Sequence, residues 1–67
     1  MNEKLQKAET ALLAYLTAKG EGATMDEILT HFRGEIAESE LRAAIWTLNA
    51  EGSTGFEDGR VRATQPA

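Results

Sequence analysis

The chain has 67 residues, a formal net charge of −4 and no cysteine. Its length suits one small domain with a thin core, and the missing cysteine excludes a disulfide framework, a thiolate zinc site and a cysteine nucleophile. No apolar run approaches the roughly 18 residues of a membrane span, and the polar start does not resemble a signal peptide. We therefore expect a single cytoplasmic domain over residues 1–67 that does not associate with a membrane.

The negative charge is concentrated in the middle of the chain. Acidic and basic residues balance before residue 24 and after residue 52, so the whole excess of −4 lies between these positions. An acidic centre has the wrong sign for a surface that binds a polyanion. The charge distribution therefore argues against strong non-specific binding to nucleic acid.

The first predicted element is a helix over residues 3–19. Asn2 is its expected N-cap, and Lys19 followed by Gly20 matches the cation-then-glycine end of a helix. Residues 20–22 then form a short flexible connection that is too brief to separate two domains. The apolar stripe of this helix consists of Leu5, Ala8, Leu12 and Leu16.

The middle of the chain predicts two further helices, over residues 25–33 and 38–51. Thr24 and Glu27 have the spacing of a capping box, in which each side chain accepts a hydrogen bond from the other residue's backbone amide. Gly52 supplies the left-handed residue that commonly follows the last turn of a helix. The two apolar stripes consist of Met25, Ile28, Leu29 and Phe32, and of Leu41, Ala44, Ile45 and Leu48.

The next segment predicts a β-hairpin over residues 53–63. Asp58 and Gly59 suit the two-residue type I′ turn that matches the twist of paired strands. This turn fixes a register in which Phe56 faces Val61, and a slip of one residue would bury arginine. The face expected to pack on the helices carries Thr54, Phe56, Val61 and Ala63, and the opposite face carries Glu57, Arg60 and Arg62.

Three helices followed by a hairpin resemble the winged helix-turn-helix superfamily. The stretch SELRAAIWTLNAEGSTGFEDGRVRAT looks like the third helix, the glycine exit and the wing of that superfamily. The resemblance covers nearly the whole chain, up to an expected frayed tail at residues 64–67. It implies a mainly α fold with a small β-hairpin, a three-helix winged helix-turn-helix.

The resemblance also implies a function. In that superfamily the third helix usually enters the DNA major groove and the wing contacts phosphates. We therefore expect a small DNA-binding protein like a transcription regulator, with weak or directional DNA contacts because the third helix begins with acidic residues. The implied contact residues are Ser39, Arg42, Ala43, Thr47 and Asn49 on the third helix, and Arg60 and Arg62 on the wing.

Trp46 supports an alternative function. Helical geometry places it roughly 140° from the apolar stripe of its helix, and a lone outward tryptophan is uncommon. It can lie over the wing or a neighbouring helix and complete the core, it can anchor a protein partner or a self-association contact, or it can stack on a nucleobase. The second option makes the chain an acidic protein-interaction module, such as an adaptor or an inhibitor of a nucleic-acid-handling complex. Its partner surface would consist of Arg42, Ala43, Trp46 and Ala50.

The partner is thus expected to be DNA or a protein, and a homodimer is a further expectation because winged helices that read palindromes usually do so as dimers. No catalytic constellation is visible. His31 has no second histidine or cysteine to share a metal ion, and the acidic residues Glu38 and Glu40 are explained by their place in the first turn of a helix. We therefore expect no enzymatic activity, no cofactor and no metal site.

Overall fold

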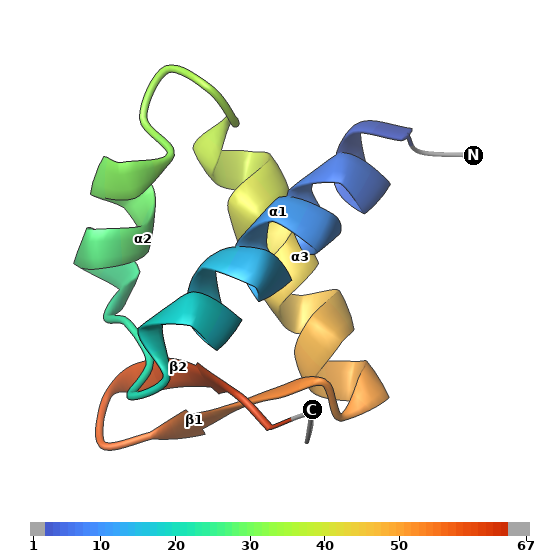
Figure 1. The fold of residues 1–67 in the computed structure, drawn as a ribbon. Coiled ribbons are helices and arrows are strands. Elements are labelled where there is room, and N and C mark those ends of the chain that lie inside the picture. The colour runs from blue at the N-terminus through green and yellow to red at the C-terminus, as the bar shows by residue number, and fades with distance from the viewer. Residues whose placement is uncertain (1–2, 65–67) are drawn as a thin grey trace.

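The computed structural model describes residues 3–64, which form three helices followed by an antiparallel hairpin (Figure 1). The predicted fold class, mainly α with a small hairpin in a winged-helix layout, is confirmed. The predicted N-cap Asn2 lies outside the described residues. The elements are α1 (Glu3–Lys19), α2 (Met25–His31), α3 (Glu38–Glu51), β1 (Thr54–Glu57) and β2 (Arg60–Ala63).

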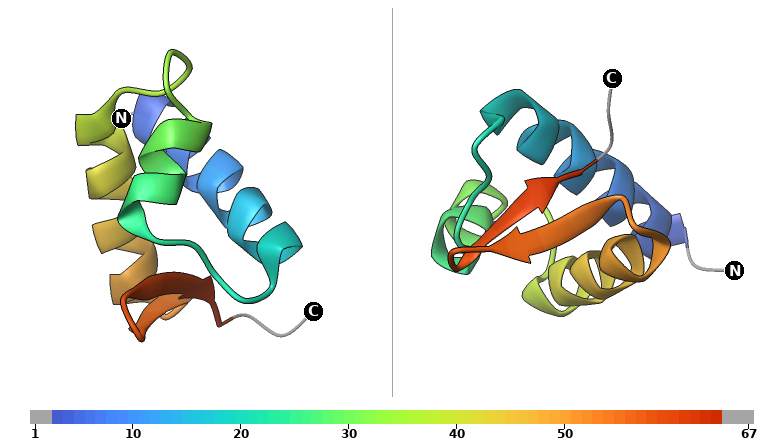
Figure 2. Two further views of the ribbon diagram at one scale, coloured as in Figure 1. Left: turned by 90° about the vertical axis from the view of Figure 1, so that its left-hand side faces the viewer. Right: turned by 90° about the horizontal axis from the view of Figure 1, so that it is seen from below.

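The three helices pack against one another, with α1 crossing in front of α3 in Figure 1, and the hairpin closes the lower end of the bundle (Figures 1 and 2). α1 packs across α3 and also contacts β2, while β1 contacts α3. Every predicted stripe contributes to a single core, because apolar faces of short helices are stable only when they are buried against one another. The buried core consists of Ala8, Leu12, Leu16, Ala23, Ile28, Phe32, Leu41, Ala44, Ile45, Leu48 and Val61.

The start of α2 has the predicted capping box. The Glu27 backbone N–H donates to the Thr24 hydroxyl over 3.1 Å, and the Thr24 backbone N–H donates to Glu27 Oε1 over 3.0 Å. These bonds satisfy two donors that have no partner within the helix. The capping box was therefore correctly predicted from two residues three positions apart.

The end of α2 differs from the prediction, which extended this helix to residue 33. The helix ends at His31, and Phe32 is the C-cap, with φ −97° and ψ 9°. Gly34, at φ +84°, then reverses the chain in a conformation that glycine adopts most readily. Phe32 is buried, as its place in the apolar stripe predicted, but it lies at the C-cap and not inside the helix. The helix therefore ends two residues earlier than predicted.

The hairpin has the predicted register. Phe56 pairs with Val61 and Glu57 with Arg60. Asp58 and Gly59 both have positive φ, +55° and +76°, as a type I′ turn requires. The turn therefore determines which side chains of β1 and β2 share a face.

A short extended segment before α2 adds to the outer edge of β2. The Ala23 N–H donates to the Val61 carbonyl over 3.0 Å, and the Val61 N–H donates to the Ala23 carbonyl over 2.8 Å. Gly22, immediately before it, is buried and has φ +92°. The prediction of a flexible connection over residues 20–22 is therefore wrong for Gly22, which lies against the sheet.

Residue 64 also differs from the prediction of a frayed tail. The Thr64 backbone N–H donates to the Ser53 carbonyl over 2.9 Å, and its hydroxyl donates to the Gly52 carbonyl. Thr64 thus closes the open end of the hairpin. The other tail residues, 65–67, lie outside the described residues. None of the helices in the described part of the chain is long and apolar enough to cross a membrane.

Candidate functional site

Trp46 and Phe56 are the exposed large hydrophobic residues of the described chain, at 77% and 61% exposure. The suggestion that Trp46 completes the core is therefore wrong. The prediction that Phe56 packs on the helices is also wrong, although its register is correct. Large exposed apolar side chains that lie close together usually mark an interaction site.

Phe56 is exposed because the helices cover only part of the hairpin face that carries Thr54, Phe56 and Val61. Thr54, at the beginning of β1, is buried and its hydroxyl donates to Asn49 Oδ1 of α3 over 2.6 Å. Val61, in the middle of β2, is buried in the core, and its backbone pairs with Ala23. Phe56 lies two residues further along β1, where most of its ring surface stays exposed.

A groove of about 230 Å³ joins the two exposed aromatic residues. The start of α2, the outward face of α3 and β1 each contribute to its walls. Arg42 and Asn49 are its polar lining residues, and the remainder of the lining is apolar. The lining residues are Met25, Arg42, Ile45, Trp46, Asn49 and Phe56, which we call the α3–β1 groove.

Arg42, Trp46 and Asn49 were expected on the outward face of α3, and the structure brings them together in this groove. Met25, Ile45 and Phe56 were expected in the core. Ile45 is buried there and also lines the groove, whereas Met25 is only partly buried and Phe56 is exposed. The helical spacing and the hairpin register of these residues were correct. Such patterns do not indicate which apolar side chains stay exposed after the elements pack. The other predicted residues of α3, which are Ser39, Ala43, Thr47 and Ala50, do not line the groove.

Arg42, the arginine of the groove, is already held by a carboxylate. Its Nε and Nη2 atoms lie 2.8 Å and 2.7 Å from Oε2 of Glu38, one helical turn earlier. Both side chains are exposed, so the pair adds only about 0.3–0.5 kcal/mol to stability. Its main effect is on local charge, because the guanidinium is neutralised where DNA would approach.

The two arginines of the wing are paired as well. Arg60 Nη1 lies 3.6 Å from Glu27 Oε1 and donates to the Gly22 carbonyl over 3.3 Å. Arg62 Nη1 lies 2.6 Å from Glu57 Oε1. Consequently, all the arginines predicted to contact DNA have carboxylate partners within the domain.

His31 is exposed but does not stand alone. Its ring stacks on Tyr15 at a centroid distance of 4.1 Å and meets the edge of Phe32 at 4.7 Å. These contacts join α1 to the end of α2. Within residues 3–64, no group of three or more histidine, aspartate or glutamate side chains is arranged to hold a metal ion.

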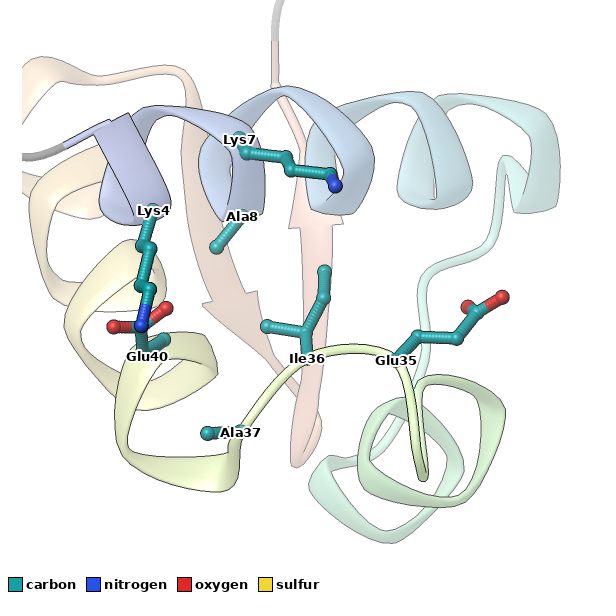
Figure 3. Close-up of a pocket in the computed structure, with 7 residues that line it drawn as sticks. All are labelled: Lys4, Lys7, Ala8, Glu35, Ile36, Ala37 and Glu40. Carbon is teal, nitrogen blue, oxygen red and sulfur yellow. The ribbon is translucent and has the colours of Figure 1, made fainter.

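A second hollow, of about 290 Å³, lies between α1 and the connection from α2 to α3 (Figure 3). Lysines from α1 and glutamates from the connection and α3 surround a small apolar floor. Its charged lining is balanced, with two lysines and two glutamates. The lining residues are Lys4, Lys7, Ala8, Glu35, Ile36, Ala37 and Glu40.

Comparisons with protein-family models, with curated proteins and with solved structures find no match for this chain. A role must therefore be inferred from the geometry and charge of the groove. Two features of the molecule bear on that role, the exposed aromatic side chains and the ion-paired arginines around them.

Proposed function

We propose that this chain is a protein-interaction domain with a winged helix-turn-helix fold, and that it binds a partner protein through the α3–β1 groove. The observation that carries the proposal is the joint exposure of Trp46 and Phe56 on one groove. Tryptophan is enriched among the residues that dominate protein–protein binding energy, and such anchors insert into desolvated pockets. Burial of both rings by a partner would remove the largest exposed apolar groups of the described surface from water.

The charges of the same region favour a protein over DNA. A phosphate approaching Arg42, Arg60 or Arg62 must compete with a carboxylate at each position. Glu38 and Glu40 lie in the first turn of α3, and each carboxylate within about 4 Å of a phosphate costs about 1 kcal/mol even in bulk water. Tight non-specific DNA binding commonly uses roughly 6–10 phosphate contacts.

The double substitution Trp46→Ser with Phe56→Ser tests this proposal. We expect it to weaken the affinity for a specifically captured protein partner by about tenfold or more, equivalent to about 1.4 kcal/mol of binding free energy. The thermal midpoint should change by no more than about 8 °C, because two exposed side chains together contribute about 1 kcal/mol or less to stability. Affinity capture with quantitative mass spectrometry, run beside a thermal melt, measures both quantities.

The matched control for this experiment is Lys4→Ser with Arg33→Ser. Both side chains are exposed and lie outside the α3–β1 groove. Capture by the control should equal that of the unchanged chain. Two results would contradict the proposed role of the groove. One is an equal loss of partner capture in both double variants, and the other is a large drop in the thermal midpoint of the groove variant.

DNA binding is the second candidate function, and the winged-helix layout itself favours it. If the chain binds DNA through its wing, Arg60→Ala and Arg62→Ala should each weaken binding at all sequences and reduce the salt slope by about 1. A titration of mixed-sequence duplex at two salt concentrations measures this. We expect the unchanged chain to bind this duplex with a dissociation constant no lower than about 1 µM. Tighter, strongly salt-dependent binding would favour the DNA-binding function over the protein-binding function.

A further inference from the structure

The outer edge of β1 offers unpaired main-chain groups beside the groove. Backbone bonding directions alternate along an antiparallel strand. The Thr64 N–H bonds the Ser53 carbonyl, so Gly55, two residues further along β1, also directs its backbone toward β2. Phe56 has the opposite parity, and its N–H and C=O therefore point away from β2, toward the free edge.

The partner strand confirms this parity from the other side. Val61, which faces Phe56, directs its own N–H and C=O outward to Ala23. The outer edge of β2 is thus covered, whereas within the described residues no segment pairs with the outer edge of β1. The unpaired N–H and C=O groups of an exposed strand edge can form hydrogen bonds with a strand of another chain.

α3 runs beside the free edge. Seen from below, α1 lies on the β2 side of the hairpin and α3 on the β1 side (Figure 2, right). Trp46 of α3 and Phe56 of β1 both line the α3–β1 groove beside this edge. A strand added to β1 would place alternate side chains toward Trp46, because successive residues of a strand point to opposite faces.

Charge around the groove favours a basic occupant. Arg42 is neutralised by Glu38, so the groove presents no free cation. Asp26 follows the lining residue Met25, and Asp58 lies two residues after Phe56, and both are exposed with no ion pair in the described part of the chain. Neither carboxylate lines the groove, but each lies within two residues of a lining residue in the chain.

We propose that the α3–β1 groove receives an extended segment of a partner protein, which adds a strand to β1 at Phe56. The segment carries an apolar side chain that packs against Trp46, with lysine or arginine near it to meet Asp26 and Asp58. This inference rests on the proposed protein-binding function and specifies the form of the partner. A second copy of this chain is a poorer occupant, because it carries the same net charge of −4.

Selection from a phage-displayed library of short random segments tests the chemistry of the occupant. The bait is the full chain, and segments that also bind the Trp46→Ser variant are removed. We expect enriched segments to contain an apolar residue with lysine or arginine near it. Trp46 is the one tryptophan of the chain, so its fluorescence reports binding of the synthetic segment directly.

N-methylation of the selected segment tests strand addition. A methyl group on the amide that bonds the Phe56 carbonyl should weaken binding by at least about tenfold, whereas methylation of the next amide, which points away, should leave it within about twofold. In parallel, the Phe56 amide should exchange rapidly with solvent in the free chain and slowly in the complex. The Gly55 amide, which faces β2, is the internal control.

Several outcomes would overturn this inference. They are enrichment of acidic segments, a helical bound segment, equal effects of methylation at both amides, or the absence of any Trp46-dependent segment. Self-association of the free chain in sedimentation, abolished by Trp46→Ser, would also replace the partner segment by a second copy. If no segment binds but Trp46-dependent capture of a folded protein persists, strand addition fails while the proposed protein-binding function stands.

Discussion

Gly22→Ala is expected to lower the free energy of unfolding by about 3 kcal/mol. An alanine Cβ at this position would lie 2.7 Å from the Val61 carbonyl oxygen and 2.6 Å from Cγ of Arg62. The oxygen cannot move freely, because it accepts the hydrogen bond from Ala23. The left-handed φ of +92° adds about 1–2 kcal/mol of its own, and the overpacking about 1–3 kcal/mol.

Gly34→Ala is the matched control for this substitution. Gly34 has a similar φ of +84°, but an added Cβ would meet nothing within 4 Å. It should therefore lose only the conformational part, about 1–2 kcal/mol. Urea unfolding followed by circular dichroism measures both variants, and equal losses would mean that the contact between Gly22 and the sheet is not as close as described.

Val61→Ala is expected to lower the free energy of unfolding by about 2–3 kcal/mol, and Phe56→Ala by less than about 1 kcal/mol. The two residues face each other across the hairpin, but Val61 is fully buried and Phe56 is 61% exposed. Removing the two methyl groups of valine loses about 1.6 kcal/mol of transfer free energy and leaves a cavity. Truncating an exposed ring removes little apolar surface that folding had buried.

The same denaturant titration compares these two variants at equal chain concentration. A domain of this size is stabilised by only about 3–5 kcal/mol, so Val61→Ala should be close to unfolding at elevated temperature while Phe56→Ala remains folded. Should Phe56→Ala prove as costly as Val61→Ala, Phe56 would belong to the core. The ring would then be unavailable as a binding anchor.

Local features of the fold could be predicted from the sequence because they depend on neighbouring residues. The capping box at Thr24 and Glu27 needs only three-residue spacing, and the turn at Asp58 and Gly59 needs only two residues that tolerate positive φ. The left-handed Gly52 after α3 is a similar case. Each of these elements has its cause within about one helical turn of chain.

The groove depends instead on residues distant in the sequence. Helical spacing predicted that Trp46 points away from its stripe, and the hairpin pattern predicted which face carries Phe56. Neither could show that α3 and β1 leave these two rings uncovered on one groove with Met25. Whether a side chain is buried depends on how far the neighbouring helices and strands extend over it. No single stretch of sequence contains that information.

The ion pairs illustrate the same limit. Glu38 and Arg42 are one helical turn apart, so their pair follows from local spacing. Arg60, by contrast, pairs with Glu27 of the capping box and bonds the Gly22 carbonyl, far away in the chain. Its partners exist only because the Ala23 segment brings the beginning of α2 beside β2.

The sequence by itself determined the helices to within two residues, the helix cap, the turn and the register of the hairpin, because these follow from side-chain periodicity and local backbone preference. The tertiary structure alone decided that Gly22 packs against the sheet, that Phe56 remains exposed and that Arg60 is neutralised by Glu27. Those outcomes depend on distances between elements joined by long stretches of chain. Packing of the whole domain sets such distances, and it thereby brings Trp46 and Phe56 onto one groove.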